Sequence, residues 1–256
     1  MSHYMVSGAA GSNPDEKPRS SKAACSQMTE PMRDLTIVFD LDGTLVDTAP
    51  DLVAATNHVL EHVGLPPVDG ESLRPHIGYG AKRMIESSTA AANLSAAEHE
   101  ALLERFLDYY GAHIAVGSRP FEGTVEALEA FKAAGATLAV CTNKREAMSR
   151  QLLDALDLSR YFAALAGRDT LAESKPHPGH LLGTISMAGG DAARAVMVGD
   201  SNVDIATAKA AKVPVVAVSF GYSDAPVASF KPDAIIDHYS ELGAAIAALT
   251  SAPQKG

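Results

Sequence analysis

Short, uninterrupted apolar runs that alternate with amphipathic stretches are the feature that most restricts how this chain can fold. Such runs suit strands buried on both faces, which occur in parallel sheets covered by helices. Strong runs lie at residues 35–40, 136–142, 193–200 and 213–219, with weaker ones at 162–167 and 233–237. Helical patterns bounded by Gly, Pro, Asp or Asn lie at 125–134, 145–156, 179–188 and 203–211. The alternation predicts an α/β fold with a doubly wound, Rossmann-like parallel sheet.

The segment from residue 49 to 117 interrupts this alternation, because it holds helical patterns and no convincing strand. Apolar residues recur at helical spacing from Leu52 to Val63, and a glycine then ends the run. Further along, Ser95 and Glu98 form a capping-box pair that opens another helix. A helical insertion therefore follows the first strand.

This pattern predicts three parts in the chain. We expect a core from residues 34–48 and 118–256, and an inserted α-helical cap over 49–117. Residues 1–33 are rich in Ser, Pro, Gly and Ala and show no periodicity, so we expect them to form a disordered N-terminal tail.

Charge and cysteine content narrow the classes of partner. The 256 residues include 21 Lys and Arg against 31 Asp and Glu, a formal net charge of −10. Without a dense basic stripe, this balance argues against nucleic acid and against an anionic membrane as partners. Neither a signal sequence nor an apolar run of membrane-spanning length is visible, and the chain has only two cysteines. We expect a cytoplasmic protein, either a monomer or a homodimer.

The residues that follow the apolar runs are the candidate site, because ligands of open parallel sheets bind beyond the carboxyl ends of the strands. Lys175 lies in the connection to a later helix. The residues that follow directly are Asp40 and Asp42 after the first run, Thr142 and Asn143 after the second, and Asp200 and Asp204 after the third. We expect these loops to converge at one edge of the sheet.

Phosphate chemistry fits this set of side chains. Clustered oxygens of Asp40, Asp42 and Asp200 suit Mg²⁺, which prefers hard oxygen ligands. The metal and Lys175 would offset the negative charge of the phosphate, so that Asp40 could attack phosphorus and form an acyl-phosphate. Asp42 could protonate the leaving oxygen and then activate water, while the Thr142 hydroxyl and backbone N–H groups bind the non-bridging oxygens.

Four strings in the chain, FDLDGTLVD, VCTNK, KPHP and VGDSNVD, resemble the four ordered motifs of the haloacid dehalogenase superfamily of phosphatases. The similarity extends over about residues 36–239. It implies that Asp40 is the nucleophile and Asp42 the general acid and base. It also implies that Thr142, Asn143 and Lys175 bind the phosphate.

The same resemblance implies a magnesium ion. Its ligands would be Asp40, the backbone of Asp42, and Asp200. The residues expected around these ligands are Ser201, Asn202 and Asp204. For Asp204 a helix-capping role competes about evenly with this role, because it falls in the first turn of a helical pattern.

The helical insertion is similar to the cap of those superfamily members that hydrolyse 2-phosphoglycolate. Stretches of both cap and core carry this similarity: DTAPDLVAATNHVLEHVGLPP and HIGYGAKRMIE in the cap region, and VCTNK and VPVVAVSFGYSD in the core. It implies hydrolysis of 2-phosphoglycolate to glycolate and phosphate through an aspartyl-phosphate. A phosphatase for another small phosphorylated metabolite such as a phospho-sugar, a sugar phosphomutase, and an inactive binding relative stay open as alternatives.

Cap residues are expected to complete the site. Gly78 and Gly80 fit a loop whose backbone approaches the substrate. Arg83, one of several basic residues beside them, is a candidate for contact with a substrate carboxylate. By contrast, we expect Asp47 and Asp51 to serve the start of the first cap helix, where acidic side chains interact favourably with the helix dipole.

Overall fold

A six-stranded parallel sheet forms the centre of the molecule, in the strand order β5-β4-β1-β6-β7-β8. The computed structural model describes residues 32–251. The strands are β1 (Thr36–Phe39), β4 (Thr137–Cys141), β5 (Ala164–Ala166), β6 (Ala195–Gly199), β7 (Val215–Val218) and β8 (Ala234–Ile236). Each of the six apolar runs thus contains one strand, and the predicted parallel α/β sheet is confirmed.

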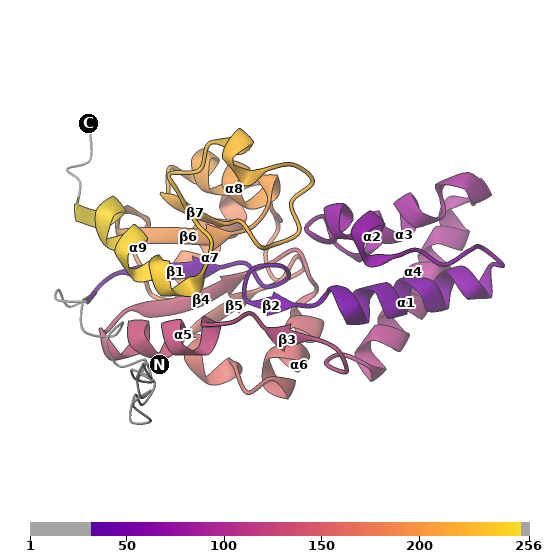
Figure 1. Cartoon of the computed structure of the whole chain (residues 1–256), viewed down its shortest axis with the longest axis horizontal. Helices are drawn as coiled ribbons and strands as arrows, with labels where there is room; N and C mark the ends of the chain where they lie inside the picture. Colours follow the sequence, from indigo (N-terminus) through magenta and orange to yellow (C-terminus); the bar gives the residue numbers. More distant parts are fainter. Residues whose placement is uncertain (1–31, 252–256) are drawn as a thin grey trace, which may run out of the picture.

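Helices cover both faces of this sheet, as Figure 1 shows. Side chains along β1 alternate between the faces: Ile37 and Phe39 belong to one buried cluster and Val38 to the other. The helices α7 and α8 pack on the face of Val38, whereas α5 and α9 pack on the opposite face. The core helices are α5 (Thr124–Ala133), α6 (Glu146–Ala155), α7 (Pro178–Met187), α8 (Asn202–Ala211) and α9 (Leu242–Ser251).

The register of the central strands explains why distant loops meet. Phe39 at the end of β1 pairs with Val140 of β4 on one side and with Val198 of β6 on the other. The three strands therefore end at the same level of the sheet. Their following loops, which begin near Asp40, Thr142 and Asp200, leave the sheet beside one another.

The insertion after β1 is helical, as expected, and projects away from the sheet (Figure 1). The Ser95–Glu98 capping box is present. Its helices are α1 (Ala49–His62), α2 (Gly70–Ile77), α3 (Ala81–Ser88) and α4 (Ala96–Ala112). At its base, β2 (Val46–Asp47) pairs antiparallel with β3 (Arg119–Pro120). This ribbon was not predicted, because strands of two residues carry no readable period.

Short 3₁₀ turns complete the connections between these elements. They lie at Ala90–Ala92, Ser159–Tyr161, Ala192–Arg194, Val227–Phe230 and Tyr239–Glu241.

The expected tail over residues 1–33 lies outside the described residues, apart from Met32 and Arg33. The backbone N–H of Met32 donates to the carbonyl of Ala134 at 3.0 Å, so this end of the described chain is attached to the core. Within residues 32–251, none of the helices has both the length and the apolar composition that crossing a membrane requires. Cys141 is buried and free.

Candidate active site

Three buried carboxylates and one buried ammonium group meet at the carboxyl edge of the sheet. Asp40, Asp200 and Asp204 each place an oxygen so that these atoms lie within 4.8 Å of one another. The Nζ of Lys175 lies 2.8 Å from Asp40 Oδ1 and 2.6 Å from Asp204 Oδ1. The structure therefore brings together the residues that three separate motifs contribute.

Burial controls the electrostatics of this cluster. It raises the pKa of Asp40 to about 7, although the nearby Lys175 acts in the opposite direction. Burial also raises the pKa of Asp200, and the neighbouring Asp204 and Asp40 carboxylates add to this effect. For Lys175 burial acts to lower the pKa, but the carboxylates of Asp204 and Asp40 outweigh it, so the pKa is raised and the side chain stays charged. The cluster thus contains one ammonium group and three carboxyl groups, of which Asp40 and Asp204 contact the ammonium directly.

The carboxylates of Asp200 and Asp204 are held by neighbouring polar groups. Asp200 accepts a hydrogen bond from Thr44 Oγ1 at 3.1 Å and another from the backbone N–H of Tyr222 at 2.6 Å. Asp204 accepts from the hydroxyl of Ser201 at 2.6 Å, in the capping box of α8, through the oxygen that does not contact Lys175. Asp204 therefore caps its helix, as one of its two predicted roles requires, and also pairs with Lys175.

The tight turn after β1 depends on Gly43. Its φ of +82° lies in the left-handed region, and a Cβ atom there would lie 2.5 Å from Asp200 Oδ2 and 2.8 Å from Tyr222 Cδ2. A side chain would therefore collide with a carboxylate of the cluster. The absence of a side chain lets the turn approach Asp200 closely.

The cluster has the properties of a divalent-cation site. Asp40 Oδ1 is buried and, within the described chain, accepts no hydrogen bond beyond its ion pair with Lys175. The carboxyl pKa values are raised by burial and by mutual repulsion, which a cation would relieve. Carboxylate oxygens are hard ligands of the kind that Mg²⁺ prefers. The residues present therefore fit a metal ion of this type.

Asp42 lies apart from this cluster. Its carboxylate accepts a hydrogen bond from Thr48 Oγ1 at 2.7 Å and contacts the Nζ of Lys144 at 2.8 Å. The side chain of Lys144 is only 8% exposed, and its Nζ lies 4.7 Å from the centre of the Tyr110 ring in α4. Burial acts to lower the pKa of Lys144, but the Asp42 carboxylate outweighs this effect and raises it.

Lys144 is a site residue that the sequence analysis did not single out. It is the last residue of the string VCTNK, so its place after β4 was visible. The signal that was missing is its partner, because Asp42 lies 102 positions earlier in the chain.

Thr142 and Asn143 occupy the loop after β4 in different ways. Thr142 is buried, and its hydroxyl accepts a hydrogen bond from the backbone N–H of Lys144 at 3.2 Å, which leaves the hydroxyl proton available to an anion. Asn143 donates through Nδ2 to the carbonyls of Gly78 at 3.2 Å and Lys175 at 3.1 Å. In this structure Asn143 therefore bridges cap and core through its side-chain amide, and its role in phosphate binding stays a prediction.

His180 supports the loop that carries Lys175. Its Nδ1 accepts from the backbone N–H of Lys175 at 3.1 Å, and its Nε2 donates to the carbonyl of Gly167 at 3.0 Å. Burial lowers the pKa of His180 to about 4, with the charge of Lys175 acting in the same direction. The ring is therefore neutral, and its two contacts define which nitrogen carries the proton.

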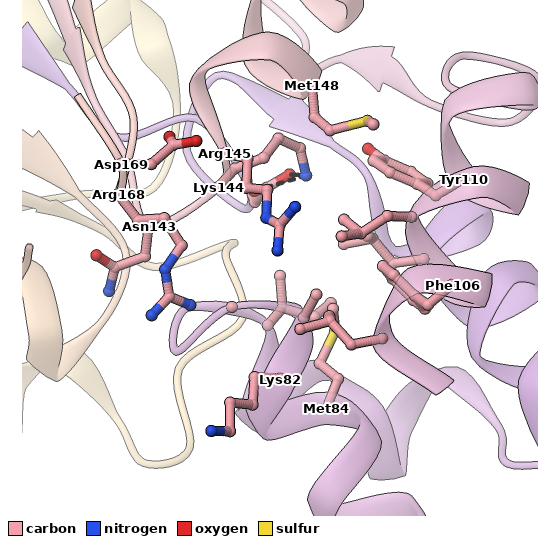
Figure 2. A pocket seen from close by; sticks show the side chains of 17 residues that line it. Lys82, Met84, Phe106, Tyr110, Asn143, Lys144, Arg145, Met148, Arg168 and Asp169 are labelled. Carbon is pink, nitrogen blue, oxygen red and sulfur yellow. Dashed lines mark hydrogen bonds and ion pairs between the residues drawn. The ribbon is translucent and has the colours of Figure 1, made fainter. Parts of the chain in front are cut away.

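A cavity of about 310 Å³ lies between the cap and this edge of the core (Figure 2). Asp42 and Lys144 line it from the core, and Gly80 and Tyr110 line it from the cap. Lys82, Met84 and Phe106 also lie on the cap side in Figure 2, opposite Asn143 and Arg168. The cavity therefore reaches the core at Asp42 and Lys144, and the acidic cluster of Asp40, Asp200 and Asp204 is not part of its lining.

Three other candidate residues have mixed outcomes. Gly78 lies where cap meets core, since its carbonyl accepts from Asn143 and a Cβ there would lie 3.4 Å from Ser201 Oγ. Arg83 does not line the cavity, whereas Lys82 does, because successive residues of a helix point in different directions. Asn202 is exposed at the first residue of α8 and makes no hydrogen bond to the cluster within the described chain. The position of Arg83 outside the cavity gives no support to its predicted contact with a substrate carboxylate, and the predicted place of Asn202 around the metal ligands stays a prediction.

Comparison with known proteins identifies relatives over most of the chain. Residues 37–218 match the family model described as haloacid dehalogenase-like hydrolase. A phosphoglycolate phosphatase of Mesorhizobium japonicum is 54% identical over 80% of this chain and 92% of its own length. A phosphoglycolate phosphatase of Caulobacter vibrioides is 47% identical over 85% of this chain and 93% of its own length.

A solved structure shows the same fold. The crystal structure of a protein from Haemophilus somnus, described as a predicted phosphoglycolate phosphatase, superimposes with a TM-score of 0.77 at 34% identity. The match covers 82% of this chain and 96% of that one. The similarity therefore includes the cap as well as the core.

Proposed function

The chain belongs to the haloacid dehalogenase-like hydrolase family, and from this premise we propose that it is a magnesium-dependent phosphatase that hydrolyses 2-phosphoglycolate to glycolate and phosphate. The observation that carries the proposal is the buried pairing of Asp40 with Lys175 beside Asp200 and Asp204. The names of relatives at up to 54% identity support the choice of substrate.

The proposed reaction begins with attack by Asp40. A carboxylate oxygen of Asp40 forms a bond to phosphorus, and the bond from phosphorus to the glycolate oxygen breaks. Asp42 donates a proton to that leaving oxygen. Water then attacks the phosphorus of the aspartyl-phosphate, Asp42 accepts a proton from the water, and phosphate is released with the Asp40 carboxylate restored.

Charge at the phosphoryl group is the main obstacle, because Asp40 and the substrate are both anionic. Lys175 supplies a fixed positive charge directly beside Asp40. The Thr142 hydroxyl donates to a non-bridging oxygen. Asp40, Asp200 and the backbone carbonyl of Asp42 would hold Mg²⁺, which when bound neutralises further charge on the transferring group.

The position of Asp42 suits proton transfer to a leaving group. Its carboxylate lines the cavity between cap and core, whereas Asp40 belongs to the acidic cluster. A leaving group in the cavity would therefore lie next to Asp42 while its phosphate lies next to Asp40. Lys144 and Thr48 act as positioning residues that hold the Asp42 carboxylate in place.

The cavity volume supports a small substrate. About 310 Å³ is at the lower end of the range for small-molecule sites. The cap lies against the core loops where Tyr110 meets Lys144 and where Gly80 approaches Asn143, and we propose that this contact excludes water during transfer. We propose that residues 49–117 act as the cap and residues 34–48 and 118–256 as the core. The cytoplasmic location and the monomeric or homodimeric state stay predictions.

Phosphate release from a substrate panel tests this proposal. The panel contains 2-phosphoglycolate, phospho-sugars, pyrophosphate and p-nitrophenyl phosphate at saturating Mg²⁺, with Asp40→Asn as the blank. We expect a preference in kcat/KM of about 100-fold for 2-phosphoglycolate, equivalent to about 2.7 kcal/mol of transition-state discrimination. Asp40→Asn should lose turnover while keeping the circular dichroism spectrum of the wild type.

Other results would contradict the proposal at different levels. Comparable low rates on all esters would refute the substrate but keep the chemistry. Transfer to a sugar without phosphate release would indicate a mutase. Turnover by Asp40→Asn would refute the assignment of Asp40 as the nucleophile. No phosphate release by the wild type from any compound of the panel would indicate a binding protein.

A further inference from the structure

The cavity between cap and core has an excess of cationic side chains in a protein of net charge −10. Its acidic lining residues are Asp42 and Asp169. Its basic lining residues are Lys82, Lys144, Arg145 and Arg168. The local field is therefore opposite in sign to that of the whole chain.

Several of these charges already have partners. Lys144 is paired with Asp42, and Lys82 lies 4.0 Å from Glu86 on the exposed side of α3. Within residues 32–251, the side chains of Arg145 and Arg168 make neither an ion pair nor a hydrogen bond. These two guanidinium groups are therefore the uncompensated charges of the cavity.

Arg145 and Arg168 lie in the loops after β4 and β5, and hydrogen bonds connect these two loops. The backbone N–H of Arg168 donates to the carbonyl of Lys144 at 3.0 Å. The backbone N–H of Glu146 donates to Asp169 Oδ1 at 2.8 Å, and Thr170 Oγ1 donates to Glu146 Oε2 at 2.6 Å. These hydrogen bonds connect the loops after β4 and β5, so the backbone that carries Arg145 and Arg168 is held in place.

Arg168 also reaches the cap. A Cβ atom on Gly80 would lie 3.2 Å from Arg168 Nη1, so the guanidinium lies close to the backbone where α3 begins. Gly80 has a φ of +90°, a conformation that favours glycine. Figure 2 shows Arg168 beside Asn143 and Lys144, on the side of the cavity opposite Phe106 and Tyr110. Arg168, which is exposed to solvent, therefore lies at the boundary between cap and core, at one end of the cavity lining.

We propose that Arg168 is a specificity-determining residue that binds a carboxylate on the leaving group of the substrate. A guanidinium presents parallel N–H donors that match the two oxygens of a carboxylate. The inference rests on the proposed function, because the phosphate is taken to lie at Asp40 and the leaving group to extend past Asp42 into the cavity. It assigns the carboxylate contact to the core loop after β5, and not to Arg83 of the cap.

The substrate class that follows is a phosphate monoester whose leaving group carries a carboxylate close to the ester oxygen. Lys144 is less suited to this contact, because the Asp42 carboxylate already compensates its charge. Arg145 lines the same cavity and adds to the positive field. A neutral or cationic leaving group would leave the guanidinium of Arg168 without a partner.

The test compares two substrates that differ at this group: 2-phosphoglycolate, and ethyl phosphate, in which a methyl group replaces the carboxylate. For Arg168→Gln we expect the preference for 2-phosphoglycolate in kcat/KM to fall about 10- to 100-fold, mainly through KM, with ethyl phosphate changed by less than about threefold. Arg168→Lys should retain part of the preference because it keeps the charge. Arg105→Gln, an exposed arginine of α4 outside the cavity, is the matched control.

Each failure has a separate signature. A wild-type enzyme that does not prefer 2-phosphoglycolate to ethyl phosphate would refute the proposed substrate before any variant is measured. A wild-type preference that persists in Arg168→Gln would overturn only the role of Arg168. Equal losses on both substrates would also overturn it, because they would indicate a general effect on the site.

Discussion

Asp51 joins the beginning of the cap to its end, which makes it a sensitive position for stability. Its buried carboxylate accepts hydrogen bonds from the backbone N–H of Gly117 at 2.8 Å, and from the N–H and hydroxyl of Ser118 at 2.8 and 2.6 Å. These donors lie 66 and 67 positions later in the chain. Asp51 lies in the first turn of α1, as predicted, and its oxygens additionally accept hydrogen bonds from the returning chain, a role that the sequence did not reveal.

The two interpretations predict different costs for Asp51→Ala. A favourable contact with the helix dipole alone contributes about 0.3–1 kcal/mol. The structure instead predicts loss of three hydrogen bonds to a charged group, each of which contributes about 1.5–3 kcal/mol before non-additivity is considered. Because two backbone N–H groups would remain without their acceptor, we expect the free energy of unfolding to fall by about 3–5 kcal/mol.

Urea unfolding of the purified protein measures this cost. Ser118→Ala removes only the hydroxyl donor and should lower the free energy of unfolding by about 1–2 kcal/mol. Asp108→Ala removes an exposed aspartate of α4 and is the matched control, with an expected change within about 0.5 kcal/mol. A cost below about 1 kcal/mol for Asp51→Ala would refute the joining role and leave the helix-dipole interpretation.

Two further predictions concern the supports of the site. Burial lowers the pKa of His180 from 6.5 to about 4, so the unfolded chain binds more protons between these values and His180 reduces stability as the pH falls through this range. For His180→Gln, we expect the fall in the free energy of unfolding between pH 7 and pH 4.5 to be smaller than in the wild type by up to about 3 kcal/mol. Urea unfolding at the two pH values measures this difference. An unchanged pH dependence in the variant would contradict the lowered pKa of His180. Gly43→Ala would direct a Cβ atom at Asp200, so the Mg²⁺ concentration for half-maximal activity should rise about tenfold or more. An unaltered Mg²⁺ titration would refute that argument.

The strands and the meeting of Asp40, Asp200 and Lys175 were predictable from the sequence. Apolar runs of strand length mark buried parallel strands, and parallel strands place their following loops at one edge. These are local or general rules, so they need no knowledge of side-chain partners. The structure confirms the sheet and brings the three residues into one buried cluster.

The partners of individual side chains were not predictable in this way. Lys144 pairs with Asp42 across 102 positions, and Asp51 binds Gly117 across 66. Arg168 approaches Gly80, which belongs to a different part of the chain. The spacing of apolar residues in the sequence shows only which side chains share one face of a helix or strand. Contacts between distant residues depend instead on the register of the strands and on the path of the loops.

Small displacements along a helix matter for the same reason. Lys82 lines the cavity and Arg83 does not, although the two are neighbours with the same charge. The ordered motifs predict a phosphate site, and the helical pattern after the first strand predicts an insertion beside it. The choice of which cations face the cavity follows from how α3 packs on the core, because a step of one residue turns a side chain by about 100° around the helix.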